Sequence, residues 1–418
     1  FNHPINDVVW PTSLRRLSMG GYFDQPILNV VWPANLRQLS MGEEFCQPID
    51  DVAWPVSLRQ LSFGDSFDQP IVEVVWPSSL REVSFGDHFP QPIAEVAWPS
   101  SLQEITFKLH FNEPIEEVTW PASLQSLSFG GYNRSITKVA WPTSLRNLSF
   151  GWLFDQPIDG VSWPASMRSL SLGGRFNQPI VNVAWPANLR QLSMGDGFRQ
   201  SIHNVAWPIS LQRLSLGASF NQPIVEVVWP PSLRKVSFGD DFSQPIAEVT
   251  WPSSLQELTF GERFAQPIKR VAWPASLRVL AFGHMLNETI AQISLPAGLL
   301  KLSFLSFTGS FNQPIDDVAW PACLQRLSFG ECFNQPISGV QWPASLRLLS
   351  FGLSTCNQPI EGVEWPASLK KLSLGEKINH PITGVLWPDF LQELNLGESF
   401  DQTITGVTWP ASLRKLSI

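Results

Sequence analysis

The sequence predicts an all-β fold, a parallel β-solenoid of about 19 coils of 22 residues without helices. First, residues 67–88, FDQPIVEVVWPSSLREVSFGDH, form a 22-residue unit that recurs along all 418 residues, and a period in the twenties is typical of solenoids. Second, apolar residues stand two apart at the end of each half of this unit, which is the spacing of a strand. Third, the units carry prolines and a glycine at short intervals, which argues against helices.

Each unit divides into two similar halves. Residues 71–77 have the pattern I-x-x-V-x-W-P, and residues 80–86 have the pattern L-x-x-V-x-F-G. The second half predicts a short parallel strand near residues 83–85 on one face of the coil, and the first half a second extended segment near residues 74–76 on the opposite face. A breaker ends each run, because Pro77 cannot donate a ladder hydrogen bond and Gly86 permits a turn.

The string W-P-x-S-L-x-x-L-x-F-G-x-x-F-N-Q-P-I resembles the FNIP repeat, a 22-residue relative of the leucine-rich repeat, over essentially the whole chain. Its L-x-x-L-x-F core resembles the L-x-x-L-x-L of leucine-rich repeats. Two features depart from that pattern: Trp stands before Pro in every unit except that of Leu295, and the polar residues after Phe occupy a different corner. The resemblance implies a right-handed parallel β-solenoid of leucine-rich-repeat type, with a binding or scaffolding role.

Residues 1–418 are expected to form a single solenoid without an internal domain boundary. Irregular coils are expected at residues 132–153, 286–310 and 333–355, with a kink near residues 295–310. The first and last units lack the polar caps that solenoids use, which predicts a segment of a longer chain or ends that meet further copies.

The inward positions of the unit predict a continuous core. The Trp before Pro shares its parity with the buried Val two residues earlier, so the Trp row is expected in this core rather than on a sugar-binding surface. The corner glutamines, such as Gln69, are expected to form a buried amide ladder that is bonded to neighbouring coils and to the backbone.

The outward positions predict the interaction surface, because equivalent residues of successive coils stack into columns. An apolar column precedes the Trp, and a basic column follows the first Leu of the second half. The candidate residues of this surface are Val9, Val31, Ala53, Val75, Ala97, Arg15, Arg37, Arg59 and Arg81.

An acidic column lies beside the apolar one in the N-terminal part of the chain. Asp51, Glu73, Glu95 and Glu117 are its members. Stacked like charges repel, so they predict either bound cations such as calcium or, as the favoured interpretation, solvated carboxylates. No cofactor is expected.

Other reactive or modifiable residues are few. Cys332 and Cys356 fall near the same corner of adjacent coils and are candidates for a disulfide, whereas four cysteines are too few for a disulfide framework. Asn133 and Asn287 begin glycosylation sequons. The six histidines fall at unrelated repeat positions, and no nucleophile–His–carboxylate or metal-ligand set recurs, so no catalytic site is predicted.

Composition narrows the function further. A net charge of −8 over 418 residues argues against a nucleic-acid surface, and no apolar run is long enough to span a membrane. The sequence therefore indicates a non-enzymatic structural repeat protein, a scaffold or filament component that assembles with itself through sheet faces or solenoid ends. The alternative is a module that binds another protein on one sheet face. An extracellular location is favoured over a cytoplasmic one.

Overall fold

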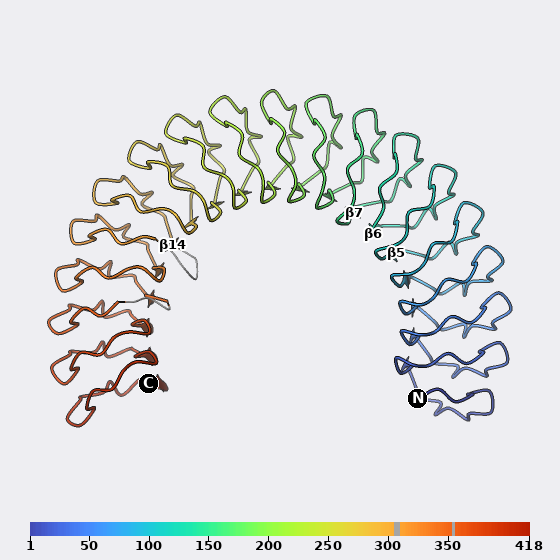
Figure 1. Cartoon of the computed structure of the whole chain (residues 1–418), viewed down its shortest axis with the longest axis horizontal. Coiled ribbons are helices and arrows are strands. Elements are labelled where there is room, and N and C mark those ends of the chain that lie inside the picture. The colour runs from blue at the N-terminus through green and yellow to red at the C-terminus, as the bar shows by residue number, and fades with distance from the viewer. Residues whose placement is uncertain (305–309, 353–355) are drawn as a thin grey trace. The chain divides into compact units, whose positions relative to one another are not determined.

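The computed structural model describes residues 1–304, 310–352 and 356–418, and in these residues it contains nineteen short parallel strands and no helix. The chain divides into two compact units. Unit 1 comprises Phe1–Gln200 and Val205–Leu211, and unit 2 comprises Ser201–Asn204 and Gln212–Ile418. Within each unit the strand arrows lie side by side along one edge of the coils (Figure 1).

Each coil contributes one strand. Unit 1 holds β1 (Arg16–Ser18), β2 (Gln38–Ser40), β3 (Gln60–Ser62), β4 (Glu82–Phe85), β5 (Glu104–Phe107), β6 (Ser126–Phe129), β7 (Asn147–Phe150), β8 (Ser169–Ser171) and β9 (Gln191–Ser193). Unit 2 holds β10 (Arg213–Ser215), β11 (Lys235–Ser237), β12 (Glu257–Thr259), β13 (Val279–Phe282), β14 (Lys301–Phe304), β15 (Arg326–Ser328), β16 (Leu348–Ser350), β17 (Lys371–Ser373), β18 (Glu393–Asn395) and β19 (Lys415–Ser417). The predicted helix-free parallel β-solenoid is confirmed.

The register of the strands follows the repeat. Leu61 of β3 pairs with Val83 of β4, and Ser62 pairs with Ser84, so each residue meets its equivalent in the next coil. Side chains alternate between the two faces of a strand, so the Leu or Val faces the core while the neighbouring Ser faces outward. A one-residue slip would expose the whole apolar set, which explains why the register is kept from coil to coil.

In the described residues, the first half of the unit, where an extended segment is expected near residues 74–76, joins no sheet. It is built from two turns, in which Val74 N–H donates to the carbonyl of Ile71 at 3.4 Å and Leu80 N–H donates to the carbonyl of Pro77 at 3.0 Å. In some coils the Trp amide also bonds within the coil, as from Trp54 to the carbonyl of Val52 at 3.0 Å. These backbone groups have their hydrogen-bond partners within the coil, and the proline has no N–H. Few backbone donors and acceptors therefore remain for a ladder between coils.

Aromatic rows run through the core. The corner residues Phe45 and Phe67 are fully buried, and their ring centroids are 6.1 Å apart. The rings of Phe63 and Phe85, one residue after the strand serine, are closer at 5.5 Å. Because strands in a sheet lie about 4.8 Å apart, this increase shows that neighbouring coils of unit 1 diverge from the sheet toward the corner.

The prediction that the Trp row belongs to the core is confirmed. Trp76 and Trp229 are each 7 % exposed, and Trp229 stacks on Trp251 with ring centroids 6.0 Å apart. The indole N–H groups of this row, that of Trp409 excepted, are buried without a hydrogen-bond acceptor among the described residues. Several indoles meet a Phe ring edge-to-face, as Trp251 meets Phe238, which is the favoured packing of aromatic quadrupoles.

The irregular coil at residues 132–153 keeps its place in the core because Tyr132 replaces the corner Phe and is fully buried. Its extra Trp152 is 54 % exposed and lies over Gly174 of the next coil, where an added Cβ would be 2.2 Å from the ring. The other expected irregularities fall partly on residues 305–309 and 353–355, which lie outside the described residues. One continuous solenoid over residues 1–418, uncapped at both ends, stays a prediction.

Candidate functional site

The predicted basic column forms one wall of an open groove in unit 1, here called the arginine groove. Its volume is about 340 Å³, and it is lined by Arg15, Arg16, Arg37, Gln38, Arg59, Gln60, Arg81 and Glu82. The residue before each strand joins the ladder, since Arg37 N–H donates to the carbonyl of Arg15 and Arg59 N–H to that of Arg37, both at 2.8 Å. These backbone bonds place the arginine side chains in one row.

The charges of the arginine groove are poorly compensated. Glu82 is the only carboxylate in its lining, and Glu82 accepts a hydrogen bond from the side-chain amide of Gln60. Within the part of the chain that the structure describes, the five arginines of the groove form no ion pair. At the end of the groove Glu82 pairs in register with Glu104, whose pKa is raised by burial and by the charge of Glu82.

The apolar column projects into solvent as predicted. Val9, Val31 and Val75 are 95 %, 76 % and 78 % exposed, and Ala53 and Ala97 are also exposed. These residues stand between the inward Val and the inward Trp, so the chain has to turn their side chains outward. Their position follows from the parity of the sequence, but their location in a turn region rather than on a strand does not.

The acidic column occupies the third position of the Ile-x-x-Val turn. Asp51, Glu73, Glu95 and Glu117 are all exposed. Gly160, Gly362 and Gly406 take the same position with positive φ, a conformation that favours glycine, which explains the change of residue type. Among the described residues no group of three or more His, Cys, Asp or Glu could hold a metal ion.

A polar ladder follows the corner Phe. The side-chain oxygen of Asn221 accepts from the backbone N–H of Ser243 and from the side-chain amide of Gln244 in the next coil, both at 3.0 Å. The glutamines thus bond across coils, as the sequence predicts, but Gln69 and Gln244 are half-buried rather than buried. The neighbouring Asn or Asp supplies the acceptor. Asn133 and Asn287 are exposed and serve as such acceptors, so both sequon side chains are structural members of the ladder.

A second ladder was not predicted from the sequence. The Ser hydroxyl of the W-P-x-S-L pattern donates to the carbonyl of a Leu in the preceding coil, as from Ser57 to Leu36 and from Ser79 to Leu58, both at 2.6 Å. The recurrence of Ser at this position in most coils is the feature of the sequence that could have predicted the ladder. It is a structural ladder, because the hydroxyls satisfy carbonyls that the turn leaves without a partner.

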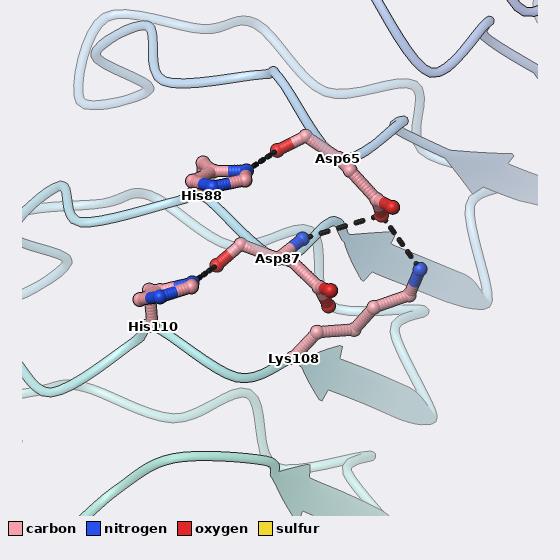
Figure 2. A network of polar contacts seen from close by, with 5 residues as sticks. All are labelled: Asp65, Asp87, His88, Lys108 and His110. Carbon is pink, nitrogen blue, oxygen red and sulfur yellow. Dashed lines mark hydrogen bonds and ion pairs between the residues drawn. The ribbon is translucent and has the colours of Figure 1, made fainter.

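A polar cluster lies at the corner after the strands of three coils (Figure 2). The ammonium group of Lys108 is 2.9 Å from a carboxylate oxygen of Asp65. The expectation that the histidines fall at unrelated repeat positions is wrong for His88 and His110, which occupy the same position of successive coils and stack with ring centroids 4.9 Å apart. Each Nδ1 lies within 3.0 Å of a backbone carbonyl, of Asp65 and Asp87 respectively. Because a carbonyl only accepts, each Nδ1 carries a hydrogen.

Replacing Lys108 with Met is expected to lower the stability of unit 1 by about 1 kcal/mol or less at neutral pH, because the pair is exposed. Lys108 lowers the pKa of Asp65 from its ordinary value of 3.8, so this stabilisation is present above that value and is lost as the pH falls. Asp65 raises the pKa of Lys108 above 10.5, so the stabilisation is also lost at higher pH. Urea unfolding of the wild type and the Lys108→Met variant at acidic, neutral and alkaline pH tests this expectation. A difference in stability between the two proteins that persists undiminished at pH 2 would contradict it.

The predicted disulfide between Cys332 and Cys356 is absent from the structure. Cys356 stands in the place of the corner Phe and is buried, whereas Cys332 precedes the corner Phe333 and is exposed. The two thiols therefore occupy different repeat positions and face different sides of the coil. Burial raises the pKa of Cys356, which disfavours its thiolate.

The repeat pattern and the fold both have matches among known proteins. The FNIP Repeat family model matches residues 1–44, 45–88, 132–175, 154–197, 198–241, 242–285 and 311–354. Among solved structures, CroV588, described as a novel circular leucine-rich-repeat protein, is 33 % identical with a TM-score of 0.70, covering 99 % of this chain and 80 % of its own. No curated protein matches the chain.

Two further solved complexes share the fold alone. The Drosophila Toll–Spätzle complex gives a TM-score of 0.62 at 13 % identity, covering 91 % of this chain and 57 % of that chain. The TLR13–ssRNA13 complex gives 0.53 at 13 % identity, covering 93 % and 58 %. This chain therefore spans less than two thirds of the matched chain in either complex. The described residues also contain no helix long and apolar enough to cross a membrane.

Proposed function

Because this chain belongs to the FNIP-repeat family of leucine-rich-repeat relatives, we propose that it is a non-enzymatic scaffold that holds protein molecules along the exposed columns of its coils. The strand register supports this most directly, since every strand residue pairs with its equivalent in the next coil. One type of side chain is thereby repeated at regular steps along a surface, which suits the binding of an extended partner.

The first partner we propose is a further copy of this chain, packed through the apolar column. Val9, Val31 and Val75 present their side chains to water in one row, and burial of apolar surface contributes about 25 cal/mol per Å². A surface that pairs with the same surface of a second copy is the commonest basis of dimers. Repeated along many coils, such contacts would build the lateral assembly expected from the sequence.

Lysines introduced at Val31 and Val75 are expected to abolish this assembly while the fold is kept, because both side chains point into solvent. Sedimentation velocity at increasing protein concentration measures it: the wild type should form larger species, and the double variant should remain a monomer. The matched control places lysines at Gln38 and Gln60, which adds the same charge at the first residues of β2 and β3. A monomeric wild type, or equal assembly of both double variants, would exclude the self-assembly proposal.

A different protein is the second candidate partner. It is favoured by the arginine groove, whose positive charges have no carboxylate partners in the part of the chain described by the structure. Such a groove attracts a partner of opposite charge. Self-assembly and partner binding use different columns, so the scaffold can perform both.

A further inference from the structure

The arginine groove of unit 1 specifies the chemistry of its partner. We propose that it binds an extended acidic segment of another protein, which crosses strands β1 to β4 along the row of arginines. This inference rests on the scaffold function proposed above and narrows its second candidate to one class of ligand.

The backbone fixes the spacing of the positive charges. Arg59 N–H donates to the carbonyl of Arg37, and Arg81 N–H donates to that of Arg59, both at 2.8 Å. Successive arginines are therefore about 4.8 Å apart, which is the distance between neighbouring strands. Like charges at this spacing repel one another unless an anion lies between them. The guanidinium groups match carboxylates in both geometry and charge.

The column beside the arginine row, formed by the first residue of each strand, carries ion pairs in other coils. In the groove this column holds Arg16, Gln38, Gln60 and Glu82. In unit 2, Lys235 of β11 is 2.9 Å from Glu257 of β12, and Lys371 of β17 is 2.7 Å from Glu393 of β18. Those lysines have their counter-charge on the adjacent strand. In the arginine groove five arginines face a single glutamate, and Glu82 is already bonded to Gln60. The groove is thus a basic surface that still lacks its carboxylates.

The ends of the groove set the length of the ligand. Beyond Arg81 the register brings Glu82 beside Glu104, and two neighbouring carboxylates would repel an acidic chain. Four arginines in one row span about 15 Å, and an extended peptide covers about 3.3 Å per residue. The groove therefore fits a segment of about five or six residues, with its acidic side chains directed at the arginines.

A peptide fits the groove better than a nucleic acid does. Single-stranded RNA is held by aromatic side chains that stack on its bases, and no aromatic residue lines the groove. A longer phosphate backbone would also run past Arg81 into Glu82 and Glu104. A short acidic segment gains the attraction of the row and ends before these carboxylates.

Fluorescence anisotropy with the full chain tests the proposal. The probe is a fluorescein-labelled peptide of six glutamates flanked by Gly-Ser pairs, and a six-glutamine peptide and a six-nucleotide oligouridylate are titrated for comparison. The glutamate peptide should bind, its affinity should fall as salt is raised, and the glutamine peptide should not bind. Tighter binding of the oligouridylate than of the glutamate peptide would overturn the choice of ligand.

Matched variants locate the site. Changing Arg37, Arg59 and Arg81 together to Gln should weaken peptide binding at least about tenfold, and the corresponding change to Lys should weaken it less, because charge remains while the bidentate geometry is lost. The control changes Arg146, Arg168 and Arg190 to Gln, which removes the same charge from the same column of unit 1 outside the groove. Equal losses in the two glutamine variants would overturn the groove as the site.

The test of the groove can fail without contradicting the proposed scaffold function. The variant with lysines at Val31 and Val75 should keep its peptide affinity, because the apolar column does not line the groove. If the wild type self-associates but does not bind the glutamate peptide at low salt, the groove proposal is wrong and the scaffold proposal stands.

Discussion

Replacing Trp229 with Ala is expected to lower the free energy of unfolding of unit 2 by about 3–5 kcal/mol, the usual range for a buried aromatic truncated to Ala. Trp229 is 7 % exposed and stacks on Trp251 of the next coil at 6.0 Å. Because each coil contacts mainly its neighbours, the cavity should weaken one place in the stack and can separate blocks that then unfold at different urea concentrations. Urea unfolding followed by circular dichroism measures both effects.

Val228 supplies the control for this prediction. It is adjacent in sequence and 83 % exposed, so Val228→Ala should change stability by no more than about 0.5 kcal/mol. Equal losses from Val228→Ala and Trp229→Ala would show that the indole is not the buried partner. A red-shifted, freely quenched Trp emission of the native wild type would lead to the same conclusion.

Replacing Gly261 with Ala is expected to destabilise unit 2 by about 3 kcal/mol, at the upper end of the cost of overpacking. An added Cβ would lie 2.1 Å from the carbonyl oxygen of Gly239, 2.3 Å from its carbon and 2.5 Å from the Cα of Asp240. All three atoms belong to the backbone of the preceding coil, so no side chain can move away. The coils would have to separate, which strains the bond from Arg263 N–H to the carbonyl of Asp240.

Gly339 is the matched control within the same unit. A Cβ added there meets no atom within 4 Å, so Gly339→Ala should be neutral or should stabilise the protein by up to about 1 kcal/mol through the unfolded state. Thermal unfolding of the two variants gives the comparison. Similar melting temperatures for Gly261→Ala and Gly339→Ala would contradict the close approach of coils at Gly261.

The repeat made much of the fold and of the surface predictable. Apolar parity at positions such as Val83 and Phe85 identified the strand and its inward face, because side chains alternate along a strand. The same parity put Trp229 in the core and Val75 in solvent. For the first half of the unit the alternation of Val and Trp predicted an extended segment, and it left open whether this segment pairs between coils. In the described residues the segment joins no sheet, and turns within the coil hold it.

The solenoid, the number of its coils and the identity of its inward and outward columns follow from the sequence alone, because a 22-residue period with strand parity buries the apolar side chains in this way. The sequence also predicted that the corner glutamines bond between coils, but the acceptors of these bonds and the serine ladder became evident only from the folded chain. The serine hydroxyls reach carbonyls one coil back, and Gln60 engages Glu82 while Arg59 has no ion-pair partner among the described residues. These choices depend on distances between coils, which are set by packing and are not written in the pattern of a single repeat.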